Sequence, residues 1–147
     1  MIKFSKIIAP TDLSKLSRVG VRRALEMGEA DGAEVILYCV ISTADDWLAN
    51  DPKFNPAAAL IPKHEKLLAD FVKEHCGDFS EKVKIREIVE IGVPDKKIVE
   101  KAEAEEADLI VISTHGRTGL DHMLVGSVTE RVIARATCPV LSMRPPK

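Results

Sequence analysis

The residues best suited to chemistry lie in one stretch, from Leu109 to Glu130. Its apolar start, Leu109–Ile112, predicts a short buried strand. Ser113 to Gly119 are small and polar, and Ser127 with Glu130 three residues later predicts a capping box at a helix N-terminus. Glycines let backbone N–H groups converge, and the first turn of a helix carries unpaired donors at the positive end of its dipole. The stretch predicts a phosphate cradle, although strand-to-helix loops without a ligand carry the same residues.

The two better-known phosphate motifs are absent. The chain holds no Gly-Lys pair, and so no G-x-x-x-x-G-K-[ST], and it holds no G-x-G-x-x-G. A P-loop NTPase and a dinucleotide-binding Rossmann site are therefore both disfavoured.

Other side chains in the stretch suggest weaker alternatives. His115, Asp121 and His122 could ligate a metal or transfer a proton, but neither Cys nor Glu completes a ligand set at useful spacing. We expect His115 to make loop hydrogen bonds and to touch phosphate, and Arg117 either to neutralise phosphate charge or to stay solvated. The segment 116–119 matches the G-x-x-G loop of KH RNA-binding domains, but it follows a strand rather than a helix.

Composition indicates one ordinary globular domain spanning residues 1–147. A net charge of −2 and an aromatic content of 4% argue against nucleic acid as a partner. No apolar run reaches membrane-spanning length, the N-terminus lacks a signal-peptide core, and the three cysteines form no C-x-x-C. We expect a cytoplasmic protein with no membrane partner.

Hydrophobic periodicity predicts five strands alternating with four helices. The strands are expected at 2–9, 34–41, 83–91, 109–112 and 140–143, and the helices at about 16–31, 62–76, 94–107 and 127–137. Residues 42–62 are the least regular part and predict an excursion or a partly helical lid. The second helix is expected to bury Leu67, Leu68, Phe71 and Val72.

The alternation predicts an α/β fold, a doubly wound parallel sheet with right-handed crossovers. Ligands of such sheets bind beyond the carboxyl ends of the strands, where the strand order reverses. That rule brings Pro10-Thr11-Asp12, after the first strand, beside the loop after the fourth.

Three segments carry a resemblance to a known family: KIIAPTDLS, EIGVPDKKIVEKAEAEEADLIVISTHGRTGL and VGSVTERVIARATCPVLSMR. Together they resemble the universal stress protein family over essentially the whole chain. The resemblance implies a five-stranded sheet in the order 3-2-1-4-5. It also implies a homodimer formed through the last strand, Val140 to Met143.

Nucleotide-binding members of that family carry the pattern G-x2-G-x9-G-[ST]. Here Gly116, Gly126 and Ser127 match it, whereas Ser113 stands at the first glycine position. In nucleotide-binding members this position lies against the ribose. A serine there could crowd the sugar or form a hydrogen bond to it.

The resemblance implies an adenine-nucleotide site with ATP, AMP or ADP as ligand, with or without Mg²⁺. Adenine would lie near Pro10 and the backbone of Val40, the ribose near Asp12, and the phosphates on the loop and helix N-terminus. The expected site residues are Pro10, Thr11, Asp12, Val40, Ile112, Ser113, His115, Gly116, Arg117, Gly126, Ser127, Val128 and Thr129. Asp12 suits sugar hydroxyls or Mg²⁺ better than bare phosphate, and locally it could also cap the first helix.

Three hypotheses about function remain open at this point. The first is an ATP- or adenine-nucleotide-binding regulator of a stress response. The second is a slow ATPase on the same site, since no dedicated catalytic base is recognisable. The third is a nucleotide-free dimeric scaffold or chaperone-like protein in which Ser113 closes the ribose pocket.

Overall fold

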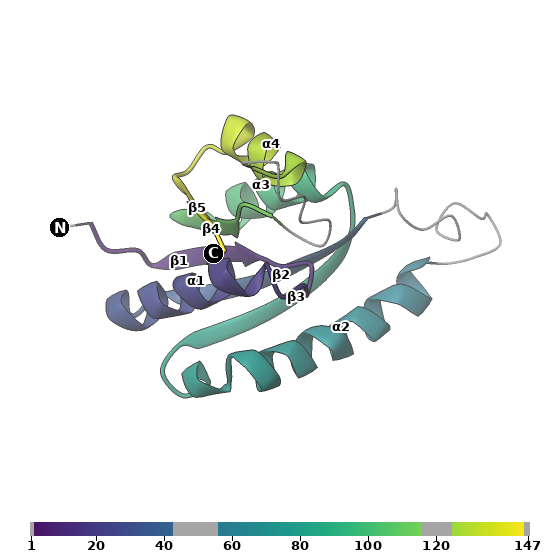
Figure 1. The fold of residues 1–147 in the computed structure, drawn as a ribbon, viewed down its shortest axis with the longest axis horizontal. Coiled ribbons are helices and arrows are strands. Elements are labelled where there is room, and N and C mark those ends of the chain that lie inside the picture. The colour runs from purple at the N-terminus through teal and green to yellow at the C-terminus, as the bar shows by residue number, and fades with distance from the viewer. Residues whose placement is uncertain (1, 43–55, 116–124, 146–147) are drawn as a thin grey trace.

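A computed structural model describes residues 2–42, 56–115 and 125–145 of the chain (Figure 1). Its strands are β1 (Lys6–Pro10), β2 (Glu34–Ser42), β3 (Lys84–Gly92), β4 (Leu109–Ser113) and β5 (Val140–Met143). Its helices are α1 (Arg18–Asp31), α2 (Pro56–His75), α3 (Pro94–Ala104) and α4 (Ser127–Arg135), and a 3₁₀ turn, Gly77–Phe79, follows α2.

The five strands form one parallel sheet in the order β3-β2-β1-β4-β5. The predicted doubly wound fold and the strand order implied by the family resemblance are both confirmed. The order reverses between β1 and β4, because β1 continues to β2 on one side while the chain later returns to β4 on the other. This reversal fixes where a ligand crevice belongs in such a sheet.

The core has two layers, one on each face of the sheet. Odd-numbered residues of β1, β2 and β4, such as Ile7, Leu37 and Val111, pack with α1 and α2. Even-numbered residues, such as Ile8 and Ile110, pack with α3 and α4. Figure 1 shows the same division, with α1 and α2 on one side of the strands and α3 and α4 on the other. Alternation along each strand therefore decides which helix pair a side chain meets.

Two helix starts differ from the sequence prediction. α2 begins at Pro56 rather than at Pro62, which lies inside the helix. The missing N–H of Pro62 costs α2 one intrahelical hydrogen bond, but the helix continues on both sides of it. α1 begins at Arg18, so the residues directly after β1 form a loop and not the helix start. Asp12 is therefore not the N-cap of α1.

The predicted buried stripe of α2 is correct except at one position. Leu68 and Phe71 are buried and Val72 packs against the same core. Leu67, by contrast, is 42% exposed. A stripe that includes neighbouring positions i and i+1 spreads over about 100° of the helix, so one of the two lies at its solvent margin.

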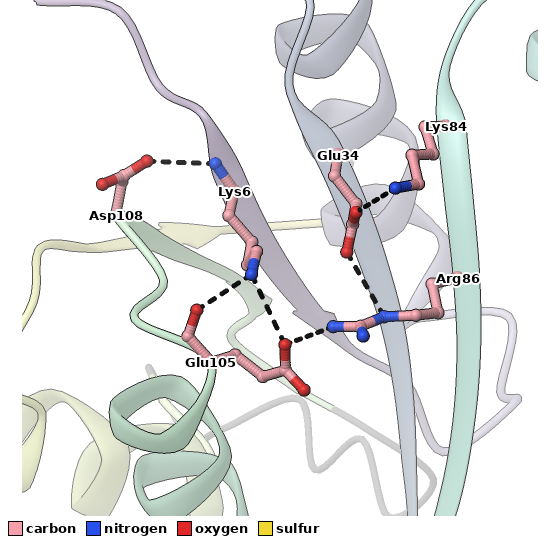
Figure 2. Close-up of polar contacts among 6 residues, drawn as sticks. All are labelled: Lys6, Glu34, Lys84, Arg86, Glu105 and Asp108. Carbon is pink, nitrogen blue, oxygen red and sulfur yellow. Dashed lines mark hydrogen bonds and ion pairs between the residues drawn. The ribbon is translucent and has the colours of Figure 1, made fainter.

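Charged side chains tie together the strand ends opposite the candidate site (Figure 2). Glu34 pairs with Lys84 at 2.9 Å and with Arg86, Glu105 pairs with Arg86 and Lys6, and Asp108 accepts hydrogen bonds from the backbone N–H groups of Ser5 and Lys6. Because the network joins β1, β2, β3 and the α3–β4 turn, it stabilises the end of the sheet at which these strands begin.

Among the described residues, every helix is too short or too polar to cross a lipid bilayer.

Candidate functional site

The site is built where the chain leaves β1 and β4. Ile7 and Ile8 of β1 lie opposite Leu109 and Ile110 of β4 in the parallel register. Because the two strands run side by side to their carboxyl ends, the loops that follow Pro10 and Ser113 start next to each other. This meeting of two distant segments agrees with the prediction from parallel topology.

The loop after β1 is held by its own side chains. The Leu13 N–H donates to Thr11 Oγ1 at 2.9 Å, and the Ser14 N–H donates to Asp12 Oδ1 at 3.0 Å. Leu13 has a φ of 67°, an angle that costs about 1–2 kcal/mol for a residue with a side chain. Asp12 thus orders this tight loop instead of capping α1.

On the β4 side of the candidate site, α4 begins directly on the backbone that follows β4. The Gly126 N–H donates to the Thr114 carbonyl at 2.6 Å, and the Thr114 N–H donates to the Met143 carbonyl at 2.8 Å. A Cβ on Gly126 would lie 2.9 Å from the same Thr114 oxygen. The glycine allows this close approach, which places the first turn of α4 beside the ends of β4 and β5.

The predicted capping box at the start of α4 is wrong. Gly126 is the N-cap, and no side chain caps the helix. Ser127 is the first residue inside the helix, one position too far along to accept the N–H that an N-cap side chain accepts. The hydroxyls of Ser127 and Thr129 therefore have different roles. Ser127 is exposed, whereas Thr129 is buried and donates to the Ser113 carbonyl at 2.7 Å.

Ser113 lies at the centre of the hydrogen bonds beneath the site. Its side chain is buried with an exposed fraction of 4%. Oγ accepts the Gly20 N–H at 2.9 Å and donates to the Ser17 carbonyl at 3.2 Å. The hydroxyl thus contacts α1 and the residue before it.

Three predicted site residues line the opposite sheet face from Ser113. Ile112 belongs to the α3–α4 core layer, and Val40 and Val128 pack against it. Pro10 is buried and follows the same alternation along β1. Pro10, Val40, Ile112 and Val128 therefore share one face of the sheet.

Val40 sits where β2 extends beyond the end of β1. Pro10 pairs with Tyr38, and the Thr11 N–H donates to the Tyr38 carbonyl at 2.9 Å. The N–H and C=O of alternate residues in a strand point to the same side, so those of Val40 point toward the β1 side as well. β1 has ended at that level, so this side of Val40 borders the loop after β1 rather than a strand.

A charged group supports β2 just before Val40. Tyr38 OH donates to Glu90 Oε1 at 2.9 Å, and Lys101 Nζ lies 2.9 Å from Glu90 Oε2. Burial raises the pKa of Tyr38 above its usual value, and the Glu90 carboxylate raises it further. Burial alone would raise the pKa of Glu90, but its bonds to Lys101 and Tyr38 hold that pKa below its usual range. The Tyr38 phenol is therefore a fixed donor in this support.

The remaining predicted residues divide between described and undescribed segments. His115 Nδ1 lies 3.0 Å from Thr114 Oγ1, as expected for a loop hydrogen bond. Gly116, Arg117, Asp121, His122 and most of the suggested lid, residues 43–55, lie outside the described residues. Within the described ranges, His, Cys, Asp and Glu side chains nowhere gather in threes as a metal site.

Sequence reasoning missed the residues that hold the two loops together. Ser17 and Gly20 of the α1 start, and Tyr38 beneath Val40, were not singled out. Ser17 Oγ lies 2.8 Å from Thr11 Oγ1 and donates to the Ser14 carbonyl at 2.8 Å. The run of Thr11, Ser14 and Ser17 at intervals of three was a local sign of such hydroxyl contacts, but their partner Ser113 lies 96 residues after Ser17.

Comparison with known proteins gives one consistent family. The family model described as the universal stress protein family matches residues 3–144. Universal stress protein MJ0531 of Methanocaldococcus jannaschii is 37% identical over 145 residues, covering 98% of this chain and 84% of that protein. A universal stress protein of Methanothermobacter thermautotrophicus is 30% identical over 142 residues, covering 96% of both chains.

Solved structures agree with the sequence matches. The structure of MJ0577, also from Methanocaldococcus jannaschii, superimposes with a TM-score of 0.84 at 29% identity and covers 99% of both chains. A universal stress protein solved in complex with cAMP has a TM-score of 0.73 at 23% identity and covers 97% of this chain and 98% of its own. At that identity the second likeness concerns the fold.

Proposed function

This chain belongs to the universal stress protein family, and on that premise we propose that it binds an adenine nucleotide at the crevice between β1 and β4. The ligand is ATP, ADP or AMP, and binding regulates the protein's part in a stress response. The observation that carries the proposal is the convergence of Pro10–Asp12, Val40 and the N-terminus of α4 at the reversal of strand order.

The adenine end of the proposed site rests on the backbone of Val40. Its N–H and C=O point toward the side that β1 has vacated, and one donor beside one acceptor matches the edge of an adenine ring. Pro10 and Ile112 supply apolar contact for the ring on the same sheet face. An apolar slot with a few fixed polar groups is the usual form of a small-molecule site.

The phosphate end rests on the first turn of α4. The N-cap Gly126 has an extended ψ of 157°, and no side chain occupies the cap position. The first N–H groups of a helix attract anions, and Ser127 adds an exposed hydroxyl at that point. Gly116 and Arg117, outside the described residues, would complete the cradle.

Asp12 is the acidic group of the proposed site. One carboxylate oxygen already accepts the Ser14 N–H, which orients the side chain at the start of the crevice. In the proposed site Asp12 would accept hydrogen bonds from ribose hydroxyls or share a Mg²⁺ with the phosphates. The family relative that was solved with cAMP supports the choice of an adenine nucleotide.

In the proposed assembly, two copies of the chain form a homodimer through β5. This strand forms one edge of the sheet, and its partner β4 lies on one side only. An unpaired strand edge is a ready template for a second strand. Two copies joined at β5 would continue the sheet from one subunit to the next.

A calorimetric titration tests the proposed function. The purified protein is titrated with ATP, AMP and GTP, each with and without Mg²⁺. We expect saturable binding of ATP, weaker binding of GTP because the Val40 backbone matches adenine, and tighter ATP binding when Mg²⁺ is present. Equal heats for ATP and GTP would contradict adenine recognition, and no heat with any nucleotide would favour a nucleotide-free scaffold.

A further inference from the structure

Ser113 is the position at which this chain departs from the glycine of nucleotide-binding relatives, and its side chain does not face the proposed adenine slot. Along β4, Leu109 and Val111 belong to the α1–α2 core layer, whereas Ile112 belongs to the α3–α4 layer. Alternation therefore directs Ser113 toward α1. Pro10, Val40 and Ile112 lie on the other face.

The Ser113 hydroxyl does the work of an N-cap for α1. Ser17 is the N-cap residue of that helix, but its own side chain makes no capping hydrogen bond. The N–H of Gly20, the third residue of the helix, is instead accepted by Ser113 Oγ at 2.9 Å. This is the N–H that an N-cap side chain ordinarily satisfies. The cap therefore comes from β4, 93 residues away in the chain.

The fit between α1 and Ser113 is tight. A Cβ on Gly20 would lie 2.9 Å from both the backbone nitrogen and Oγ of Ser113. Gly20 has no positive φ, so this contact, rather than an unusual backbone angle, accounts for the glycine. The first turn of α1 is thus seated directly on the end of β4.

A chain of hydroxyl contacts continues from Ser113 to the loop that carries Asp12. Ser113 Oγ donates to the Ser17 carbonyl, and Ser17 Oγ donates to the Ser14 carbonyl. With the Ser17 proton used in this way, Thr11 must donate in its 2.8 Å contact with Ser17, which leaves Thr11 Oγ1 to accept the Leu13 N–H. Each of the three hydroxyl groups, those of Ser113, Ser17 and Thr11, then donates to one defined acceptor.

The carbonyl of Ser113 extends the same junction to α4. It accepts the hydroxyl of buried Thr129, in the first turn of that helix, at 2.7 Å. One residue therefore ties together the starts of both helices that border the crevice. Its side chain holds α1 and the β1 loop, and its backbone holds α4.

We propose that Ser113 is a positioning residue for nucleotide binding, whose hydroxyl fixes the start of α1 and, through Ser17 and Thr11, the Asp12 loop. The inference rests on the proposed function. It reverses the expectation that a serine at this position blocks the ribose. In this chain the cap of α1 comes from the Ser113 hydroxyl.

Two substitutions separate positioning from crowding. Ser113→Ala removes the hydroxyl and keeps Cβ, whereas Ser113→Gly removes both. If the hydroxyl positions the site, both variants bind ATP more weakly than the unmodified protein, by a similar factor of about five to ten, as the loss of one or two hydrogen bonds predicts. If Cβ crowds the ribose, Ser113→Gly binds more tightly while Ser113→Ala is unchanged, and the proposal is overturned.

A control and a second readout exclude a merely structural effect. Val83→Ala shortens a buried side chain at the far end of the sheet and lowers stability without touching the site, so its ATP affinity should equal that of the unmodified protein. Amide hydrogen exchange of the nucleotide-free protein should show faster exchange at Gly20 and Leu13 in both Ser113 variants and not in Val83→Ala.

The outcomes distinguish the two proposals. If the unmodified protein binds no nucleotide in the same titration, the proposed function fails and the positioning role fails with it. If it binds ATP and the Ser113 variants bind equally well, or exchange at Gly20 and Leu13 is unchanged, only the positioning role fails.

Discussion

Gly126 has a φ of −71°, an angle that any residue adopts, so its lack of a side chain must be explained by space. The space is occupied by the Thr114 carbonyl, 2.9 Å from the Cβ that Gly126 does not have. The glycine was predicted to make room for a phosphate, and the structure adds a close contact within the protein. Gly20 is explained in the same way, by Ser113.

Gly126→Ala should therefore lower both stability and nucleotide binding. A new Cβ must push the start of α4 away from Thr114, an overpacking that costs about 1–3 kcal/mol. It should also weaken ATP binding roughly tenfold or more, because the first N–H groups of α4 would move away from the proposed phosphate position. A tenfold loss of affinity corresponds to about 1.4 kcal/mol of binding free energy. Urea unfolding and ATP titration measure the two effects.

Gly77→Ala is the matched control for this substitution. A Cβ there would meet nothing within 4 Å, and the residue has no positive φ. Its stability and ATP affinity should match those of the unmodified protein. Unchanged ATP binding in Gly126→Ala would argue against a phosphate cradle at the α4 start.

At the scale of single elements, hydrophobic periodicity predicted the strands and helices well, because alternation and helical spacing are local properties. Four strands, β2, β3, β4 and β5, agree with the predicted ranges to within one residue at either end, whereas β1 begins at Lys6 rather than at residue 2. Helix starts were predicted less well. The N–H groups at the start of α1 are satisfied by Ser113, which follows 93 residues after Gly20, and no local pattern reports a cap of that kind.

The candidate site could be predicted in outline for a related reason. Parallel topology alone places the loops after β1 and β4 together, so the meeting of these two segments could be predicted, whereas the nucleotide site assigned to Pro10–Asp12 and Gly126 stays a prediction. The direction of the Ser113 side chain and the support of Val40 by Tyr38 depend on tertiary contacts. The sequence did not contain them in any local form.

The docking of α4 on α3 rests partly on one ion pair. Arg135 in the last turn of α4 donates to Asp95 in the first turn of α3 at 2.9 Å. Asp95 is buried, whereas the Arg135 side chain is 54% exposed. Arg135→Gln should therefore destabilise the protein more than Asp95→Asn, because it leaves a buried carboxylate without its charged partner.

The expected loss for Arg135→Gln is about 1–3 kcal/mol in the free energy of unfolding, measured by urea denaturation. Arg131→Gln, at an exposed position of the same helix, is the control and should be near neutral. A larger loss in Asp95→Asn than in Arg135→Gln would mean that Asp95 acts mainly on its own helix, through the α3 N-terminus.

The ion pairs at the end of the sheet where the strands begin predict that acid lowers the stability of the fold. Hydrogen bonding to Lys84, followed by the charge of Arg86, lowers the pKa of Glu34, and hydrogen bonding to Arg86 lowers the pKa of Glu105. A carboxylate whose pKa is lower in the folded state stabilises the protein above its unfolded pKa, about 4.3 for Glu. That stabilisation is lost as the pH falls through the lower, folded value.

Glu105→Gln should thus reduce the loss of stability between about pH 5 and pH 3, because one of the carboxylates that must be protonated is gone. Urea unfolding at a series of pH values measures this slope, and Glu81→Gln, at an exposed position, serves as the control. An identical slope in Glu105→Gln and the unmodified protein would show that acid denaturation is governed elsewhere.

At the scale of the whole molecule, the sheet has two edges, β3 and β5. β3 is long, and its starting residues belong to the ionic network, with Lys84 and Arg86 paired to Glu34. Charged residues on an edge strand oppose strand addition. β5 is short, and of its residues only Ser142 is exposed. The proposed dimer therefore uses the edge that carries fewer charges.

Backbone directions in β5 identify a substitution that separates dimer pairing from folding. The Pro139 carbonyl accepts the N–H of Ile110 in β4, and the Met143 carbonyl accepts the N–H of Thr114, directly after β4. By alternation the backbone of Leu141 also faces β4, and Ser142 directs its N–H to the open edge. A charge at Leu141 would also disturb the core, against which that side chain packs. Ser142→Pro removes only the outward N–H, and proline is tolerated on edge strands.

Ser142→Pro should convert the proposed dimer to a monomer while leaving thermal unfolding of the subunit nearly unchanged. Light scattering after size-exclusion chromatography measures the mass, and Ser142→Ala, which keeps the N–H, should remain dimeric. A Ser142→Pro protein that stays dimeric would place the interface away from β5.

The dimer is also expected to affect nucleotide binding. The Thr114 carbonyl accepts the Gly126 N–H, and the Thr114 N–H donates to the Met143 carbonyl at the end of β5. Pairing at β5 would therefore also stabilise the backbone around Thr114, next to the proposed phosphate site. The monomeric variant should accordingly bind ATP more weakly than Ser142→Ala.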